Sequence, residues 1–230
     1  MADQEAHGPA EGKEGGQRLT APIDAEALEN GRLLFAKECT FVAGAARIDQ
    51  LPPGHLPEIA FAGRSNVGKS SLVNALTGRR TLARVSNTPG RTQQLNFFDL
   101  GGRLMLVDLP GYGYNQAGKS VAAGWSRVIE DYLRGRPELR RVCLLIDSRH
   151  GLKPVDEEVM KILDQAAVIY QIVLTKVDKL KPAALAETTA SVAAGGARHV
   201  AAHPVIMPTS SEAKTGVAEL RAELASLAAA

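Results

Sequence analysis

The chain has 230 residues, of which 45% are apolar and 23% are charged, and its formal net charge is +2 at pH 7. This length suits one domain of about 200 residues with a tail, and the apolar content suffices for a sizeable core. No apolar run approaches the roughly 20 residues that cross a bilayer, and the N-terminus is acidic and glycine-rich, so we expect neither a membrane span nor a secretory signal. The two cysteines, Cys39 and Cys143, indicate core thiols in a reducing, cytoplasmic environment rather than a disulfide framework.

Two N-terminal segments precede the main body of the chain. Residues 1–22 are rich in Gly, Ala, Glu and Pro and have almost no large apolar side chains, which predicts a disordered acidic tail. Residues 23–54 form an N-terminal extension, with a weak helix at 24–38, a candidate N-cap at Asp24 and a candidate strand at 40–50. Residues 1–30 hold seven acidic and two basic side chains, so the remainder is basic. That balance is compatible with RNA or ribosome binding, and equally with a solvated surface of mixed charge.

Strand-like and helix-like segments alternate after residue 55. The alternation predicts an α/β domain at 55–230 with a doubly wound, mostly parallel sheet of six strands. A Gly-Gly pair at 101–102 between two apolar runs indicates a hairpin, so one edge strand is expected to be antiparallel. The expected strands are 58–62, 94–100, 103–108, 141–147, 169–174 and 204–208, and the expected helices are 69–77, 119–134, 155–167, 183–194 and 216–228.

A phosphate-binding pattern, G-x-x-x-x-G-K-[ST], joins the first expected strand of this domain to the first helix. Its glycines let the backbone curl so that successive N–H groups and the positive end of the helix hold phosphate oxygens. The lysine supplies a charge to the β- and γ-phosphates, and the final serine offers its hydroxyl to Mg²⁺. The loop consists of Gly63, Arg64, Ser65, Asn66, Val67, Gly68, Lys69 and Ser70.

A second motif, Asp108-Leu109-Pro110-Gly111, follows the expected strand 103–108. In a sheet of this kind ligands bind at the carboxyl ends of the strands. Asp108 is therefore expected to hold Mg²⁺ through water, and the Gly111 N–H to sense a γ-phosphate. The alternative is an ordinary β-turn, because Asp, Pro and Gly are favoured turn residues.

The remaining strand ends carry residues that suit a guanine base. Asp178, in Thr175-Lys176-Val177-Asp178, can accept two hydrogen bonds from N1–H and N2–H of guanine, a donor pair that adenine lacks. Lys176 can lay its methylene stem along the base, whereas the alternative is an exposed charged loop. The N–H groups of Thr209, Ser210 and Ser211 are candidates for the guanine O6, although alone they suggest only a polar helix start.

The segment between the phosphate loop and Asp108 is polar and rich in Arg, Thr and Gly. It is a candidate switch ordered by γ-phosphate and Mg²⁺, with an ordinary solvent loop as the alternative. Thr88 and Thr92 are both candidate magnesium ligands within it.

The full order of motifs is that of a GTPase, and its finer pattern resembles the EngB family of bacterial ribosome-biogenesis GTP-binding proteins, in the TrmE-Era-EngA-EngB-septin-like class. The matching stretches are GRSNVGKSSL at 63–72, NTPGRTQQLNFF at 87–98, DLPGYGY at 108–114, TKVDK at 175–179 and TSS at 209–211. The resemblance implies a GTP- and GDP-binding domain at 55–230 that hydrolyses GTP with Mg²⁺. It also implies a role in large-ribosomal-subunit assembly and in normal septation and cell division.

Among the site residues, the resemblance implies that Thr92 rather than Thr88 is the switch magnesium ligand. The metal set is then Ser70, Thr92 and Asp108, and the residues expected to act on the transferring phosphoryl group are Lys69, Thr92 and Gly111. The switch residues implied to border the nucleotide are Gly90, Arg91, Thr92, Gln93 and Gln94.

Three positions bear on mechanism. Thr175 stands where many GTPases have Asn, a difference that the resembled family shares, so one amide contact is replaced by a hydroxyl. Tyr112 stands where many GTPases carry a water-orienting Gln, which predicts slow intrinsic hydrolysis and an active site that a partner completes. Arg91 is a candidate to supply a positive charge from the same chain, with a solvent-facing side chain as the alternative. Asn66 is similar to the Asn of potassium-stimulated GTPases, and a turn-favouring Asn is the alternative.

The expected partners are GTP or GDP and a large-ribosomal-subunit precursor or its rRNA. We expect no membrane association, and we expect the protein to be a monomer. Two basic groups are candidates for phosphate contacts, although an RNA-binding motif is missing. Two other functions remain open: an ATP-using phosphate-loop protein, and a division-site scaffold whose hydrolysis is incidental. The basic groups are Arg134, Arg136, Arg140 and Arg141, and Arg79, Arg80 and Arg84.

Overall fold

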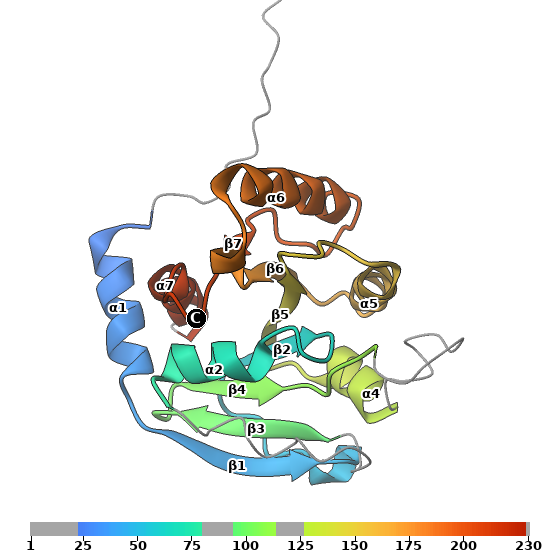
Figure 1. Cartoon of the computed structure of the whole chain (residues 1–230). Coiled ribbons are helices and arrows are strands. Elements are labelled where there is room, and N and C mark those ends of the chain that lie inside the picture. The colour runs from blue at the N-terminus through green and yellow to red at the C-terminus, as the bar shows by residue number, and fades with distance from the viewer. Residues whose placement is uncertain (1–22, 80–93, 114–126, 229–230) are drawn as a thin grey trace, which may run out of the picture.

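The computed structural model describes residues 23–79, 94–113 and 127–228. Within them a central sheet of seven strands has the order β1-β3-β4-β2-β5-β6-β7 (Figure 1). β4, β2, β5, β6 and β7 are parallel, whereas β3 runs antiparallel to both of its neighbours. The strands are β1 (Cys39–Ala45), β2 (Glu58–Gly63), β3 (Leu95–Leu100), β4 (Leu104–Asp108), β5 (Leu139–Asp147), β6 (Tyr170–Thr175) and β7 (Met207–Pro208).

The predicted α/β class and the mostly parallel sheet are confirmed, but the prediction of six strands with the antiparallel strand at the edge is wrong. β1, from the N-terminal extension, pairs with β3 and takes the edge, so the antiparallel strand lies one place inside it. Phe41 packs edge-on against Phe98 of β3, with ring centroids 5.7 Å apart. The Ala- and Gly-rich composition of 39–45 gives a weak strand signal, which is why sequence alone marked it only as a candidate. The predicted hairpin is present, since φ is positive at Gly101 (61°) and Gly102 (65°).

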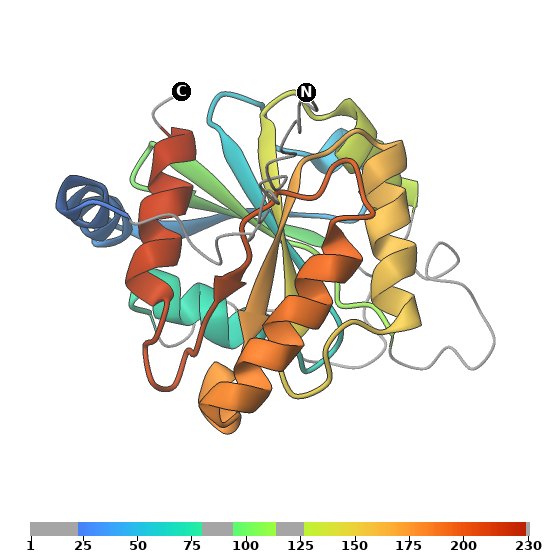
Figure 2. The ribbon, with the colours of Figure 1, turned by 90° about the horizontal axis from the view of Figure 1, so that it is seen from above.

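Helices cover both faces of the sheet. One face packs on α4, α5 and α6, and the other on α2 and α7, with α1 lying along α7 (Figures 1 and 2). Asp24 accepts a hydrogen bond from the Ala27 N–H at 2.7 Å, which confirms it as the N-cap of α1. The helices are α1 (Ala25–Phe35), α2 (Lys69–Thr77), α4 (Arg127–Gly135), α5 (Pro154–Gln165), α6 (Pro182–Gly196) and α7 (Val217–Ala228), with 3₁₀ turns at Ile48–Gln50 and Val177–Lys179.

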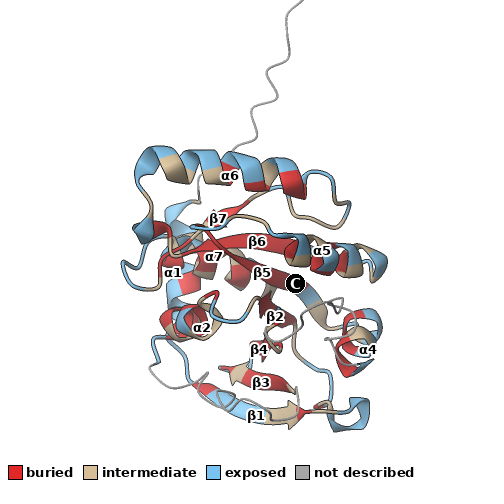
Figure 3. Ribbon diagram, turned by 45° about the vertical axis from the view of Figure 1, so that its right-hand side comes forward, coloured by how far each residue is buried: buried red, intermediate tan, exposed pale blue. Residues whose placement is uncertain are grey.

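The core lies on both faces of the parallel strands. β2 shows the alternation: Ile59 and Phe61 face the α2–α7 side, and Ala60 and Ala62 face the α4–α6 side. Buried residues run along the central strands, whereas β1 exposes part of its length (Figure 3). Both cysteines are buried and free, and burial raises the pKa of Cys39 to about 11 and that of Cys143 to about 12, as expected of core thiols.

Two of the arginines proposed as RNA contacts have partners within the protein. Arg136 donates to the buried carboxylate of Glu58 at 2.6 and 2.9 Å. Arg141 is buried and pairs with Glu223 at 2.5 Å. Arg134 and Arg140 are exposed and are the members of that group that face solvent. Among the described residues, no helix is both long and apolar enough to cross a membrane.

Candidate nucleotide-binding site

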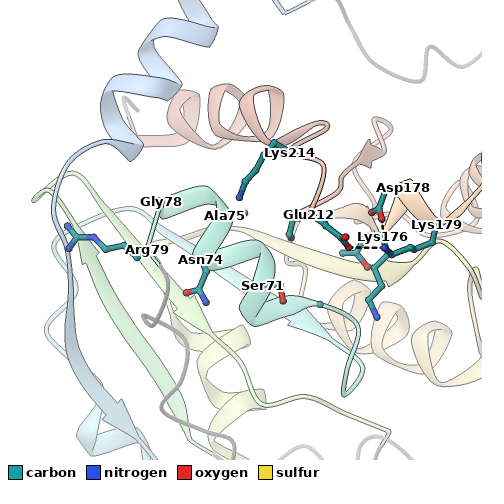
Figure 4. Close-up of a pocket in the computed structure, with 13 residues that line it drawn as sticks. Ser71, Asn74, Ala75, Gly78, Arg79, Lys176, Asp178, Lys179, Glu212 and Lys214 are labelled. Carbon is teal, nitrogen blue, oxygen red and sulfur yellow. Dashed lines mark hydrogen bonds and ion pairs between the residues drawn. The ribbon is translucent and has the colours of Figure 1, made fainter.

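Loops that follow the parallel strands meet at one edge of the sheet, as expected for a doubly wound fold. They border two adjoining cavities. One, of about 440 Å³, is lined by the phosphate loop together with Gly111. The other, of about 820 Å³, is lined by α2 and the segments around 175–179 and 211–214 (Figure 4). Gly68, Ser71 and Lys176 line both, so one elongated ligand can span them.

The phosphate loop has the curled backbone that its motif predicts. Gly68 lies at φ 105° and Asn66 at φ 64°, and α2 begins at Lys69, so the last two residues of the motif form the start of the helix. A residue other than glycine would be strained at position 68, whereas asparagine tolerates the left-handed conformation of position 66. The loop therefore places successive N–H groups and the helix N-terminus at the 440 Å³ cavity, an arrangement suited to phosphate oxygens.

The motif after β4 meets the phosphate loop as predicted. The Lys69 ammonium forms an ion pair with the carboxylate of Asp108, and both side chains are almost fully buried. Leu109 is a core residue, and its N–H donates to the Phe61 carbonyl at 3.0 Å, which extends the pairing of β4 with β2. This pairing brings Gly111 to the 440 Å³ cavity, where Ser70 also lies.

The segment after β6 is clamped onto the phosphate loop. The Thr175 hydroxyl donates to the Val67 carbonyl at 2.7 Å, so the side chain that replaces the common Asn points into the loop and is buried. Lys176 donates to the Asn66 carbonyl at 2.7 Å, and its Nζ lies 2.9 Å from Asp147 Oδ2. The lysine stem thereby crosses between the two cavities.

Asp178 presents an ionised carboxylate at the larger cavity. The Ser210 hydroxyl donates to its Oδ1 at 2.6 Å. Lys179 Nζ lies 3.0 Å from Asp178 Oδ2 and 2.8 Å from Glu212 (Figure 4). The hydrogen bond from Ser210, followed by the one from Lys179, lowers the pKa of Asp178 below its ordinary value. An oriented, ionised acceptor with spare lone pairs is what N1–H and N2–H of guanine require.

The segment after β7 supports Asp178 more than it faces a base. The Thr209 N–H donates to the Leu174 carbonyl at 2.7 Å, and the Ser210 N–H donates to Thr215 at 2.9 Å. Those two donors, predicted as contacts for the guanine O6, are therefore used within the fold. Ser211 lines the 820 Å³ cavity, and its N–H finds no acceptor among the described residues, so it is the member of the trio left for a base.

Sequence reasoning missed Asp147, which lies at the end of β5 on the same edge. Burial opposes its ionisation, but hydrogen bonds from Arg149 and Lys176 hold the pKa of the Asp147 carboxyl well below its usual range. Asp147 thus fixes the Lys176 ammonium against the phosphate loop. The end of a buried strand at the ligand edge was the signal that could have found it.

Other predicted site residues divide between the described and undescribed parts of the chain. Gln94 is described, and its side-chain amide donates to Asn96 Oδ1 at 3.1 Å. Val177 is buried, and Arg64 lines the smaller cavity. Beyond the described residues lie the tail 1–22, Arg80 and Arg84, and the switch positions Thr88, Gly90, Arg91, Thr92 and Gln93.

The described donors fit magnesium. Mg²⁺ usually takes only one or two protein oxygens and completes its shell with water and substrate phosphates. The Ser70 hydroxyl and the Asp108 carboxylate are hard oxygen donors of that kind next to the phosphate loop. No cluster of three or more His, Cys, Asp or Glu side chains suited to a metal occurs in the described ranges.

Comparison with known proteins agrees with this geometry. Residues 58–176 match the family model described as "50S ribosome-binding GTPase". The "Probable GTP-binding protein EngB" of Rhodospirillum rubrum is 62% identical over 209 residues, covering 89% of this chain and 90% of that protein. The chain belongs to the EngB family of GTP-binding proteins. A second relative, the "Probable GTP-binding protein EngB" of Bradyrhizobium diazoefficiens, is 55% identical over 91% of this chain and 97% of its own length. The chain is therefore a GTP-binding protein of the GTPase class.

Solved structures support the fold. The crystal structure of "a probable GTP-binding protein engB" superposes with a TM-score of 0.55 at 23% identity, covering 75% of this chain and 98% of that one. Aquifex aeolicus Era superposes with a TM-score of 0.55 at 20% identity, over 76% of this chain and 57% of Era. EngB and Era thus share the phosphate-loop GTPase fold with this chain.

Proposed function

We propose that this EngB-family GTPase binds GTP or GDP with Mg²⁺ across the two adjoining cavities, hydrolyses GTP slowly, and acts as a switch in large-ribosomal-subunit assembly. The observation that carries the nucleotide assignment is Asp178. Its carboxylate is held ionised at the larger cavity, and Lys176 joins that cavity to the phosphate loop. Adenine presents no such donor pair, so its binding would displace water from this carboxylate without replacing the lost hydrogen bonds.

The described residues suit the steps of phosphoryl transfer. Lys69 and the loop N–H groups stabilise the charge on the transferring group, and Gly111 contacts the γ-phosphate. Ser70, with Thr92 of the switch, would ligate Mg²⁺, and Asp108 would hold it through water. The bound metal would neutralise charge on the phosphates. Hydrolysis is proposed to change the conformation of Gly111 and of residues 87–94.

Slow hydrolysis is proposed from the orientation of Tyr112. Its phenol is buried and donates to Asp156, away from the 440 Å³ cavity. Among described residues, position 112 therefore supplies no side chain to orient an attacking water. A partner group is proposed to complete the site, as arginine does in other GTPases with gains of about 10³ to 10⁵ in rate.

Potassium stimulation remains a separate expectation. Asn66 lines the phosphate cavity, where its side-chain carbonyl would contribute to a monovalent cation site. Its φ of 64° also accounts for an asparagine here without any cation. Equal GTPase rates in potassium and sodium buffers would remove the cation from the proposal.

The ribosomal role is supported by the description of the matching family model, "50S ribosome-binding GTPase". The test is co-sedimentation with purified large subunits and their precursors in the presence of GDP, a non-hydrolysable GTP analogue or an ATP analogue. We expect association with the GTP analogue alone. Association independent of nucleotide would contradict the switch, and association with the ATP analogue would favour an ATP-using protein.

A matched variant sharpens that test. Asp178→Asn should associate with subunits in the presence of a xanthosine triphosphate analogue but not of the GTP analogue, which links the base site to ribosome binding. Neutralising the exposed Arg134 and Arg140 should weaken the association and flatten its salt dependence if they contact rRNA phosphates. We propose that the protein affects septation indirectly, because septation fails when large-subunit assembly is impaired. Septal enrichment of the protein without ribosome binding would instead favour a division-site scaffold.

A further inference from the structure

Two buried side chains and Arg64 of the phosphate loop form a cluster whose mutual contacts the binding roles above do not use. Tyr112 is 5% exposed, and its hydroxyl donates to Asp156 Oδ1 at 2.9 Å. Asp156 is fully buried near the start of α5, and its Oδ2 accepts the Lys153 N–H at 2.9 Å. Arg64 Nε lies 3.2 Å from Asp156 Oδ1, as an ion pair whose N–H is not directed at the oxygen. We name Tyr112, Asp156 and Arg64 the Tyr112 latch.

Main-chain hydrogen bonds join Tyr112 to the two residues of the phosphate loop that flank Arg64. The Ser65 N–H donates to the Tyr112 carbonyl at 3.0 Å, and the Tyr112 N–H donates to the Gly63 carbonyl at 3.3 Å. Gly111 directly precedes Tyr112 in the chain. It lies so close to the phosphate loop that a Cβ at position 111 would lie 3.3 Å from Ser65 Oγ. The position of Gly111 is therefore set by where Tyr112 is held.

The latch contains a charge that the core alone does not require. An ionised carboxylate with no exposure loses its hydration, and apolar side chains of similar volume often stabilise a fold as well or better. Burial accordingly raises the pKa of Asp156, although Arg64, the Lys153 N–H and the Tyr112 hydroxyl oppose the shift. A costly polar group that joins the phosphate loop, the Gly111 segment and α5 suits a role in positioning.

We propose that the Tyr112 latch is a positioning device that holds Gly111 against the phosphate loop, so that its N–H is placed for the γ-phosphate and GTP is distinguished from GDP. The inference rests on the proposed nucleotide site. Tyr112 is thus a positioning residue, acting through the Gly111 main chain rather than through its phenol.

The fold supplies a matched control. Tyr132 is also fully buried, and its hydroxyl donates to Glu58 Oε2 at 2.9 Å, with Arg136 on the other oxygen. This second phenol–carboxylate–guanidinium cluster joins α4 to Glu58, at the start of β2, whereas the phosphate loop follows the end of that strand. Tyr132→Phe therefore removes the same kind of bond without touching the nucleotide site.

The experiment compares the affinities of Tyr112→Phe, Tyr132→Phe and the unaltered protein for fluorescent GDP and for a fluorescent non-hydrolysable GTP analogue. For Tyr112→Phe we expect binding of the GTP analogue to weaken roughly tenfold, the scale of one hydrogen bond to a charged group, with GDP affinity unchanged within about twofold. Tyr132→Phe should leave both affinities unchanged even though thermal unfolding shows a comparable loss of stability.

A second variant alters the other partner of the same contact. Asp156→Asn keeps one oxygen for the Tyr112 hydroxyl, places an NH₂ group against the Lys153 N–H and removes the charge facing Arg64, so it should lose part of the same discrimination. The double variant should be no worse than the more affected single variant, because both act through one contact. An unchanged GTP-to-GDP affinity ratio in Tyr112→Phe, or equal weakening of both nucleotides, would overturn the latch. Failure of the unaltered protein to bind either nucleotide would instead overturn the proposed function.

Discussion

Replacing Asp178 with asparagine should reverse the base preference of the site. The carboxylate accepts a hydrogen bond from Ser210 and pairs with Lys179, and its remaining lone pairs are offered to two guanine donors. Asparagine can still accept from Ser210 and from N1–H, but its NH₂ group then faces the N2–H of guanine, donor against donor. Xanthine carries a carbonyl oxygen at that position, which accepts from the same NH₂ group.

The size of the effect follows from two charge-assisted hydrogen bonds. Each contributes roughly ten- to hundredfold in affinity. The substitution removes the bond to N2–H and takes the charge from the acceptor of N1–H, so we predict about 10²- to 10⁴-fold weaker GDP binding, with a gain of similar order for xanthosine diphosphate. Glu212→Gln is the matched control, because this carboxylate also pairs with Lys179 at the same cavity but is 76% exposed. It should alter GDP affinity by less than about twofold.

The assay is competitive titration against fluorescent GDP, with circular dichroism to show that each variant is folded. If Asp178→Asn bound GDP and xanthosine diphosphate with unaltered affinities, Asp178 would not contact the base and the guanine assignment would fail. If both nucleotides weakened equally, the substitution would have disturbed the pocket rather than its specificity.

Three further outcomes follow from one contact at the phosphate loop and from two residues away from the site. Thr175→Val removes the buried hydrogen bond to Val67, so GDP and xanthosine diphosphate should both weaken, by about three- to tenfold in titration, with their ratio unchanged. Arg221→Leu removes the hydrogen bonds from α7 to two carbonyls near the end of α2. We expect the free energy of unfolding to fall by about 2 kcal/mol and the melting temperature, measured by calorimetry, to fall by about 4–8 °C. The control Arg198→Leu, at an exposed ion pair, should lower the free energy of unfolding by less than about 1 kcal/mol. Burial lowers the pKa of His203 below 6.5, so as the pH falls the unfolded chain binds this proton before the folded chain does. The free energy of unfolding should therefore fall as the pH drops below about 6.5. His203→Gln should flatten that part of the decline in denaturant titrations between pH 8 and 5.5.

Features with local causes could be predicted from the sequence. The phosphate loop is a contiguous pattern whose glycines and lysine act through their own backbone and side chain, and the structure places it between β2 and α2 as expected. Asp108 and Asp178 could be found because each follows an apolar run, and parallel strands bring such ends to one edge. The hairpin at Gly101-Gly102 likewise follows from backbone freedom at two adjacent residues.

Features that depend on distant partners could not be predicted. Asp156 lies 44 positions from Tyr112, and no spacing rule connects a residue of α5 with one that follows β4. The sequence presents Arg136 as a candidate contact for RNA phosphates, because its partner, Glu58, lies 78 positions away. The sequence suggests a role for Tyr112 only through the residue that it replaces, whereas its burial depends on how α5 packs against the sheet.

The N-terminal extension shows the same limit at the level of topology. Weak strand propensity left 40–50 as a candidate, and only its pairing with β3 makes β1 the seventh strand. In α1, a Cβ at Gly31 would lie 2.5 Å from the Ala222 backbone nitrogen, so the helix approaches α7 closely. We propose that the extension and residues 55–230 fold as one unit, since both ends of the extension are packed on that body.

Isothermal titration calorimetry of the purified full chain with GDP and with ADP, in magnesium buffer, tests most directly whether one guanine nucleotide occupies the joined cavities. The structure predicts a single GDP site and affinity for ADP at least about a hundredfold weaker. No heat with GDP, or equal affinity for the two nucleotides, would contradict the assignment of Asp178 and the phosphate loop to one pocket.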